Sequence, residues 1–382
     1  MTAPTDPIYL DHNATTPLLP EVVDAMLPYL REHFGNPSSS HVYGRRARAA
    51  VERARTQVGA LIGCAADEVY FTSGGTEANN LAIRGVAEAS PDRRHIVTTV
   101  IEHPATASPC QWLERHGYRV SRAGVDALGC VRLDDLTAAV DDDTAIVTVM
   151  HANNETGVLQ PVADIARAAR ACGAVVHTDA AQSVGKVPVD VGALGIDLLS
   201  VAGHKLYAPK GVGALYVRRG TPLAPFLLGA GHERGVRPGT ENVASIVGLG
   251  VACDRARRDL DIIGTRLRAL RDRLWTLLCT RIPDLALNGH PDRRLPNTLN
   301  VRFPGASGSA LLDATPEVAA STGSACHAGG ESASVVILAM GVSPAEAIGS
   351  VRLTVGRPTT EDDVARAADA LARAWARLRA RA

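Results

Sequence analysis

One lysine of this 382-residue chain stands where an amine could be reactive. Of 40 basic residues, only Lys186, Lys205 and Lys210 are lysines. Lys205 follows the apolar run IDLLSV (196–201) almost directly. A lysine that loses its water at the end of a buried strand has a lowered pKa and can form a Schiff base. Lys186, in the loop-like GKVPVD, and Lys210, beside proline and glycine, are both expected in turns, with Lys210 in solvent.

Polar side chains also follow the other apolar runs. Asp179 closes AVVHTD (174–179), where a carboxylate needs a cation such as a protonated ring nitrogen, or serves as a helix N-cap. His103 follows HIVTTV and is expected to stack on an aromatic ligand, to act as an acid or base, or to be structural. Asn154, after AIVTVM, is either a turn former or a donor to a ligand oxygen.

A possible phosphate cradle lies in TSGGTEANN (72–80). Gly74 and Gly75 permit a tight turn, and the free N–H groups of the helix that follows, with the Thr76 hydroxyl, suit an anion. The alternative is an ordinary N-cap by Thr76. The segment matches neither common nucleotide-binding glycine loop. Combined with the histidine, the asparagine, the carboxylate and the lysine, this cradle matches what pyridoxal 5′-phosphate requires.

The elements that must position these residues alternate along the first two-thirds of the chain. Helices are predicted at 46–62, 76–89 and 162–172, and strands at 68–71, 95–100, 145–150, 174–179, 196–201 and 212–217. This order predicts an α/β protein with a mostly parallel sheet, which binds ligands at the carboxyl ends of its strands. A long helix over 242–281 and an Ala/Arg-rich helix from 361 follow, with a domain boundary near 250–260.

Composition excludes several classes of protein. Forty acidic and 40 basic residues give no net charge, so neither a nucleic acid nor an anionic membrane surface is an expected partner. No apolar run is long enough to span a membrane, and the N-terminus lacks a secretory signal. Seven cysteines form no C-x-x-C pair and no zinc-finger spacing, so we expect no metal site and a reducing cytoplasm.

The chain resembles the cysteine desulfurases of the NifS/IscS type, which belong to the class V aminotransferase group of fold-type-I pyridoxal-phosphate enzymes. The motifs that carry the resemblance are YLDHNATTP (9–17), FGNPSSSH (34–41), TSGGTEANN (72–80), EHPA (102–105), NNETGVLQP (153–161), HTDAAQSVGK (177–186), GHKLYAPKGVGALYVRRG (203–220), GHERGVRPGTEN (231–242), STGSACHAGG (321–330) and SVRLTVGRPTTEDD (350–363). The resemblance implies a large cofactor-binding domain (15–255) with a mostly parallel seven-stranded sheet. It also implies a smaller α+β domain (1–14 and 256–382) that carries a catalytic cysteine loop.

The resemblance assigns residues to each part of the cofactor. Lys205 would hold it as a Schiff base, Asp179 would pair with the pyridinium nitrogen, and His103 would stack on the ring. Asn154 and Gln182 would hydrogen-bond the ring substituents, notably the 3′ oxygen.

Other residues would hold the phosphate and the substrate. Gly75, Thr76 and His204 would bind the phosphate. Thr240 would reach the phosphate of the partner subunit, which implies a homodimer with shared sites. Arg352 would clamp the carboxylate of L-cysteine, a role that suits a planar guanidinium; Asn154 would also contact the substrate.

Cys326 would carry the distinguishing chemistry. It lies in a run of small residues with three glycines, STGSACHAGG, which predicts a loop rather than a packed apolar segment. Its thiolate would attack the sulfur of the substrate, giving alanine and a persulfide for an acceptor protein. His327 is a possible assistant. Cys172, Cys253 and Cys279, in helical stretches, are expected to be inert small hydrophobes.

The sequence departs from the family pattern at three places. Ala202 stands where a phosphate-binding serine is usual, Pro238 replaces a usual serine or alanine, and GESASVV lacks a common Glu-Pro-Ser. The chain also ends soon after its last helix, so the acceptor is open: an iron–sulfur scaffold, a thiolation enzyme or a sulfur carrier. A lyase that releases sulfide or selenide from cystine or selenocysteine without protein relay, and a silent subunit that only binds partners, are the alternatives.

Overall fold

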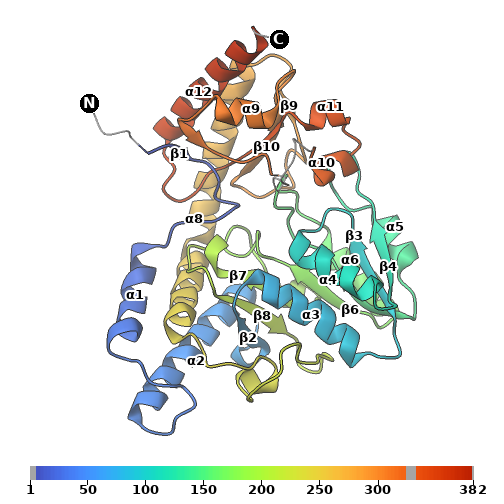
Figure 1. The fold of residues 1–382 in the computed structure, drawn as a ribbon, viewed down its shortest axis with the longest axis vertical. Helices are drawn as coiled ribbons and strands as arrows, with labels where there is room; N and C mark the ends of the chain where they lie inside the picture. Colours follow the sequence, from blue (N-terminus) through green and yellow to red (C-terminus); the bar gives the residue numbers. More distant parts are fainter. Residues whose placement is uncertain (1–5, 324–332, 381–382) are drawn as a thin grey trace.

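The computed structural model describes residues 6–323 and 333–380, so Cys326 and His327 lie outside the described residues. Two bodies lie one above the other, and a single long helix runs along both (Figure 1). The lower body contains the large sheet, and the upper body contains the chain's C-terminal third together with its N-terminal strand.

The large sheet has seven strands in the order β2-β8-β7-β6-β5-β3-β4. Their bounds are β2 (Val69–Thr72), β8 (Gly213–Val217), β7 (Leu198–Ala202), β6 (Val175–Asp179), β5 (Thr144–Thr148), β3 (His95–Thr99) and β4 (Arg119–Ala123). Neighbours from β7 through to β4 are parallel, and only β8 runs antiparallel to both of its neighbours. The predicted mostly parallel sheet is therefore confirmed.

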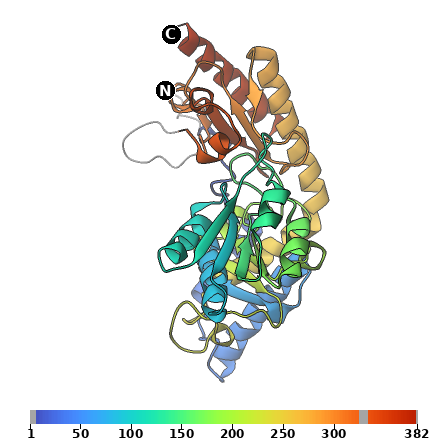
Figure 2. The ribbon, with the colours of Figure 1, turned by 90° about the vertical axis from the view of Figure 1, so that its right-hand side faces the viewer.

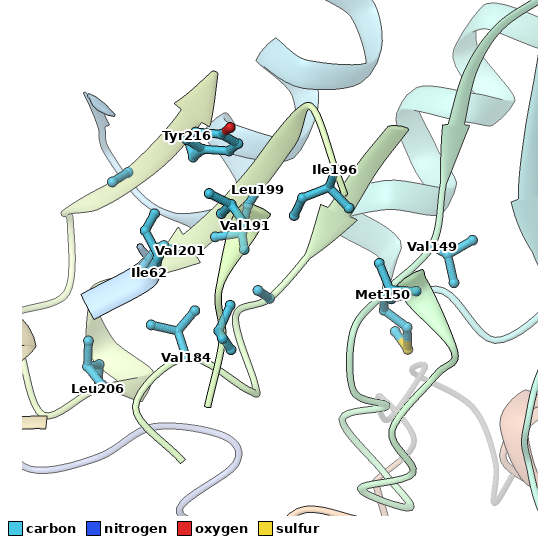
Figure 3. Packing of buried hydrophobic residues seen from close by; sticks show 14 of the residues in the cluster. Ile62, Val149, Met150, Val184, Val191, Ile196, Leu199, Val201, Leu206 and Tyr216 are labelled. Atoms are coloured by element: carbon cyan, nitrogen blue, oxygen red, sulfur yellow. The ribbon is translucent and has the colours of Figure 1, made fainter. Parts of the chain in front are cut away.

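Helices cover both faces of this sheet (Figure 2), which explains why its central strands are apolar throughout. Leu198 and Leu199, adjacent on β7, belong to different apolar clusters because successive side chains point to opposite faces. The first cluster includes Ile62, Leu199 and Val201 (Figure 3). The covering helices are α2 (Val42–Ile62), α3 (Gly75–Ala89), α4 (Pro104–Glu114), α5 (Leu133–Ala139), α6 (Val162–Ala171) and α7 (Val191–Leu194).

The upper body is built on a three-stranded antiparallel sheet in the order β12-β10-β9. Its elements are β9 (Ala286–Leu287), β10 (Thr298–Arg302), α9 (Gly308–Asp313), β11 (Val318–Ala319), α10 (Val335–Ala339), α11 (Pro344–Ala347), β12 (Ser350–Thr354) and α12 (Glu361–Arg379). The N-terminal strand β1 (Ile8–Tyr9) pairs in parallel with β11, so the two ends of the chain share this body. Helix α1 (Pro20–Arg31) returns the chain to the lower body.

Helix α8 (Val243–Arg281) joins the two apolar cores. Its first turns bury Leu249 in the core of the large sheet, and its last turns bury Leu274 in the core of the upper body. The predicted domain boundary after residue 255 falls inside this helix, and the division into domains stays a prediction. No helix of the described residues is long and apolar enough to cross a membrane.

Candidate active site

A cavity of about 860 Å³ lies at the carboxyl ends of the parallel strands. Most of the predicted site residues line it: Gly75, Thr76, His103, Asn154, Asp179, Gln182, His204, Lys205 and Arg352. Gly323 and Ala333, the described residues on either side of the segment that contains Cys326, line it as well. The fold therefore brings together predicted site residues that are up to 277 positions apart in the sequence, Gly75 and Arg352 (352 − 75).

The Lys205 amine has no hydrogen-bond or ion-pair partner among the described residues. Lys205 lies in the single 3-10 turn η2 (Gly203–Lys205) that follows β7, as the sequence predicts. Burial lowers the pKa of Lys205 to about 8, against an opposing effect of the Asp179 carboxylate and with a further lowering by Arg352. An amine with this pKa is partly neutral near pH 7, and a neutral amine is the form that attacks a carbonyl group.

The Asp179 carboxylate, at the end of β6, is held by two donors. The Asn79 Nδ2 group donates to Oδ2 at 2.7 Å, and the Ala181 backbone N–H donates to Oδ1 at 2.9 Å. Asn79 is completely buried on α3, and sequence reasoning missed it. A signal was present, because Asn79 stands one helical turn after Gly75 and Thr76 and so faces the same side of the helix. The carboxylate is thereby oriented to pair with a protonated ring nitrogen.

His103 is the N-cap of α4, and this contact defines its tautomer. Its Nδ1 atom accepts a hydrogen bond from the Ala105 backbone N–H at 3.1 Å, so a neutral ring carries its proton on Nε2. Burial, and then the positive charge of Lys205, lower the pKa of His103. The ring that lines the cavity is therefore neutral at neutral pH, which suits stacking on a flat heterocycle.

Glu102, next to His103, also lines the cavity but adds little negative charge to it. Burial raises the pKa of Glu102 to about 8. Its carboxyl group accepts hydrogen bonds from the Thr99 hydroxyl at 2.7 Å and from the Met150 backbone N–H at 3.0 Å. These contacts link the end of β3 to Met150, which follows the end of β5, at the cavity wall.

The start of α3 forms the predicted anion cradle. The N-cap is Gly74, with φ of 151°, a conformation that favours glycine, and no side chain caps the helix. The alternative reading, in which Thr76 is an ordinary N-cap, is therefore wrong, and the first N–H groups are left for a ligand. Ala202 borders the cradle, because a Cβ atom on Gly75 would lie 3.2 Å from the Ala202 Cβ. His204 Nδ1 lies 3.2 Å from the Thr15 hydroxyl oxygen.

Arg352 reaches the cavity from β12 of the upper body. Its Nη2 group forms an ion pair of 2.8 Å with Asp11, and Nη1 donates to the Asn154 carbonyl oxygen at 3.0 Å. The buried Nε–H has no partner among the described residues. The two Nη contacts thus hold the guanidinium at the cavity wall, and each Nη group carries a second N–H that can donate to a substrate carboxylate. Sequence reasoning gave no role to Asp11, although it lies in the YLDHNATTP motif.

Lys186 is buried beside the cavity. It lies in a turn, as predicted, but it is only 9% exposed, and its amine donates to Asn13 Oδ1 at 3.1 Å and to Gln182 Oε1 at 3.0 Å. Because the side chain folds inward beneath Gln182, this lysine is part of the site's surroundings and not an unused loop residue. Lys210, by contrast, is exposed in its turn, as predicted.

Thr240 does not line the cavity of its own chain and is exposed. Of the six cysteines in the described residues, all are free thiols. Cys253 is buried in α8 and Cys172 is partly buried, as expected for small hydrophobes, but Cys279 is exposed, so that interpretation of Cys279 is wrong. Its position on α8 faces solvent, which helix periodicity alone does not reveal without knowing what the helix packs against.

The cavity fits pyridoxal 5′-phosphate by the chemistry of its donors. An uncapped helix start suits the phosphate, an oriented carboxylate suits the ring nitrogen, and an unpaired amine of lowered pKa suits the aldehyde carbon. No group of three or more metal-ligating side chains occurs within residues 6–323 and 333–380. When bound, this cofactor withdraws electrons from the carbon that carries the substrate's amino group.

Comparisons with known proteins agree with this arrangement. The Aminotransferase class-V family matches residues 8–367. The chain is 47% identical to the cysteine desulfurase NifS of Azotobacter vinelandii over 94% of this chain and 90% of that protein. It is 46% identical to the cysteine desulfurase IscS of Dictyoglomus turgidum, over 97% of this chain and 95% of that protein.

Solved structures show the same fold. A NifS-like protein superposes with a TM-score of 0.90 at 35% identity, over 96% of this chain and 98% of its own. SspA in complex with cysteine superposes with a TM-score of 0.80 at 34% identity, over 91% of this chain and 98% of its own. The predicted fold-type-I architecture is thereby confirmed, and the chain belongs to the Aminotransferase class-V family.

Proposed function

We propose that this protein is a pyridoxal-phosphate-dependent L-cysteine desulfurase that forms alanine and a persulfide on Cys326. The observation that carries the proposal is one cavity that combines Lys205, Asp179 and Arg352 and whose wall includes both flanks of the segment containing Cys326. The names of its relatives support the same reaction.

Three residues of the cavity have a defined task in this reaction. Arg352 binds the substrate carboxylate through the guanidinium edge that Asp11 and Asn154 leave free. Asp179 pairs with the protonated ring nitrogen, because Asn79 holds its carboxylate in position. Lys205 holds the cofactor and afterwards moves a proton at the substrate carbon, a task that its pKa of about 8 permits.

The sulfur step is a displacement at sulfur by the Cys326 thiolate. A new S–S bond forms as the C–S bond of the substrate breaks, and the electron pair of the C–S bond remains on the substrate carbon. That carbon takes up a proton, and alanine leaves. The two sulfur atoms together lose two electrons and the substrate carbon gains two as C–S becomes C–H, so the step needs no external oxidant.

A homodimer is part of the proposal. Thr240 is exposed, and large apolar side chains are also exposed on the lower body, among them Phe34 at 77% and Leu228 at 91%. The proposed subunit contact would cover these side chains. Under this proposal, each subunit contributes Thr240 to the phosphate of its partner.

A cytoplasmic location and a sulfur-acceptor protein complete the proposal. The free thiols of the described residues support a reducing compartment. The chemistry requires an acceptor that attacks the outer sulfur of the persulfide and displaces the Cys326 thiolate, which describes a thiol carried by another protein.

The test is mass spectrometry of the holoenzyme after incubation with L-cysteine, together with quantification of alanine. We expect a 32-Da addition on Cys326 (the mass of one sulfur atom, roughly) and formation of alanine without a keto acid. Cys326→Ser should abolish both, whereas Cys279→Ser, the matched change at an exposed thiol, should retain both. Release of sulfide by Cys326→Ser at the wild-type rate would instead indicate a lyase without protein relay.

A further inference from the structure

The buried amine of Lys186 lacks the carboxylate partner that usually accompanies a buried lysine. No ion pair of Lys186 occurs within residues 6–323 and 333–380, and its hydrogen-bond acceptors are the amide oxygens of Asn13 and Gln182. Burial lowers the pKa of Lys186 well below its ordinary value, and the charges of Lys205 and Arg352 lower it further. Burying an amine without a carboxylate partner costs free energy, so the contacts of this amine bear on what it does at this position.

The contacts of Lys186 decide which way the Gln182 amide points. The two ends of a glutamine amide have nearly the same shape, so hydrogen-bond partners alone distinguish oxygen from nitrogen. The Lys186 amine carries N–H donors whether it is charged or neutral, and it donates to Gln182 Oε1 at 3.0 Å, which places that oxygen toward Lys186. On the other side, the Asn13 backbone carbonyl can only accept, which places Nε2 toward Asn13 at 3.0 Å.

This arrangement leaves one Nε2–H of Gln182 for a ligand. The amide group has two N–H donors, and the Asn13 carbonyl uses one of them. Gln182 lines the cavity, is only 4% exposed, and makes no further side-chain donation to a described residue. At this position, the protein therefore presents a hydrogen-bond donor to the cavity and not an acceptor.

Asn13, whose backbone carbonyl accepts a hydrogen bond from Gln182, is itself hydrogen-bonded to residues of the upper body. Its Oδ1 atom accepts from Asn297 at 3.0 Å, its Nδ2 donates to the Thr298 hydroxyl at 2.9 Å, and its backbone N–H donates to the Thr354 hydroxyl at 3.1 Å. All of these groups are buried. The Asn13 carbonyl, which accepts from Gln182 Nε2, is thus fixed in place. Lys186 donates to the other end of the same amide, Oε1.

We propose that Lys186 is a positioning residue, which orients Gln182 so that its free N–H faces an oxygen acceptor on the aromatic ring of the bound cofactor. The inference rests on the proposed function, because it requires the cofactor in this cavity. It adds a specificity: the site favours a ring that bears an ionised oxygen beside the aldehyde over the same ring without that oxygen.

The test compares two ligands on two lysine variants. The dissociation constants of pyridoxal 5′-phosphate and of its 3-deoxy analogue are measured by absorbance titration of the full-length apoenzyme. Lys186→Met keeps the side-chain volume but removes the donor. A hydrogen bond to a charged acceptor is worth about tenfold or more in affinity, so we expect the preference for the 3-oxygen to fall by about that factor in K186M. Lys210→Met, the same change at an exposed lysine, should keep the full preference.

The two-ligand design separates positioning from general damage. If K186M weakened both ligands equally, or kept the wild-type preference, or if K210M lost the preference too, the inference would be wrong. Should K186M fail to fold, Lys186→Gln replaces it: its amide can both donate and accept, so it no longer selects an orientation, and a smaller loss of preference is expected. An unchanged preference in K186Q would equally refute the inference. A protein that shows the wild-type preference but forms no persulfide would refute the proposed function alone.

Discussion

Ala202→Ser tests the anion cradle by adding the hydroxyl group that this chain lacks. Ala202 ends β7, is 4% exposed and lines the cavity. Its Cβ would lie 3.2 Å from a Cβ on Gly75, so a hydroxyl at residue 202 is placed at the uncapped start of α3. We expect the added hydroxyl to donate to the cofactor phosphate beside the helix N–H groups.

The size of the effect follows from the kind of hydrogen bond. A hydrogen bond from a neutral donor to a charged acceptor contributes about 1.5 to 3 kcal/mol, and each 1.4 kcal/mol is about tenfold in affinity. Ordering the hydroxyl and stripping it of water reduce the gain, so we place the expected tightening near the lower end, at about tenfold. The side chain changes by one oxygen atom, so the free energy of unfolding of the apoenzyme should change by less than about 1 kcal/mol.

The assay is a titration of apoenzyme with pyridoxal 5′-phosphate and, separately, with pyridoxal, which lacks the phosphate. A202S should bind the first about tenfold more tightly and the second with unchanged affinity. Ala107→Ser, which adds the same hydroxyl to the wall formed by α4, is the control and should leave both affinities unchanged. Equal tightening for both ligands, or none for either, would refute the placement of the phosphate at α3.

Two predictions concern pH. Because only the neutral amine of Lys205 attacks the cofactor aldehyde, the rate of cofactor loading should rise roughly tenfold per pH unit below 8 and level off above it, as stopped-flow absorbance would show; a rate independent of pH between 6 and 8 would contradict the pKa of about 8. Burial lowers the pKa of His151 and of His177 from 6.5 to about 4. Their contribution to stability is complete above pH 6.5 and is lost as pH falls toward 4, by about 2 kcal/mol each between pH 7 and 5. Urea unfolding at both pH values should show this loss, and His177→Asn should reduce it; an equal loss in the variant would contradict the assignment.

The central strands of the large sheet were predictable because burial on both faces leaves a simple pattern. β3, β5, β7 and β8 are buried at every residue, and each is a short apolar run in the sequence. β4 at the sheet edge was missed, because RVSRA has a single buried residue and no apolar run. The antiparallel direction of β8 was also invisible, since strand direction depends on the path of the connecting chain and not on local composition.

Site residues that end a strand were predictable from the sequence. Residues that hydrogen-bond those site residues were missed. Lys205 and Asp179 directly follow apolar runs, and their chemistry is unusual for such positions. Asn79 and Asp11 act through Asp179 and Arg352. Helical spacing places Asn79 on the same side of the helix as Gly75 and Thr76, but the sequence does not identify Asp179 or Arg352 as the partners. Such contacts follow only from the packing of α3 on the sheet and of β12 beside the N-terminal segment.

Lys186 shows how far the type of a local element can mislead. Turns lie on the surface in most proteins, and GKVPVD has the composition of a turn. Here the turn follows β6 at the edge where the upper body covers the sheet, so its lysine points inward to Asn13 and Gln182. In a chain with 37 arginines and three lysines, two of the lysines lie at the cavity: Lys205 lines it, and Lys186 donates to Gln182, which also lines it. A guanidinium is larger and remains charged at any ordinary pH, so neither position could accept arginine: Lys205 must become neutral to react, and Lys186 must fit beneath an amide.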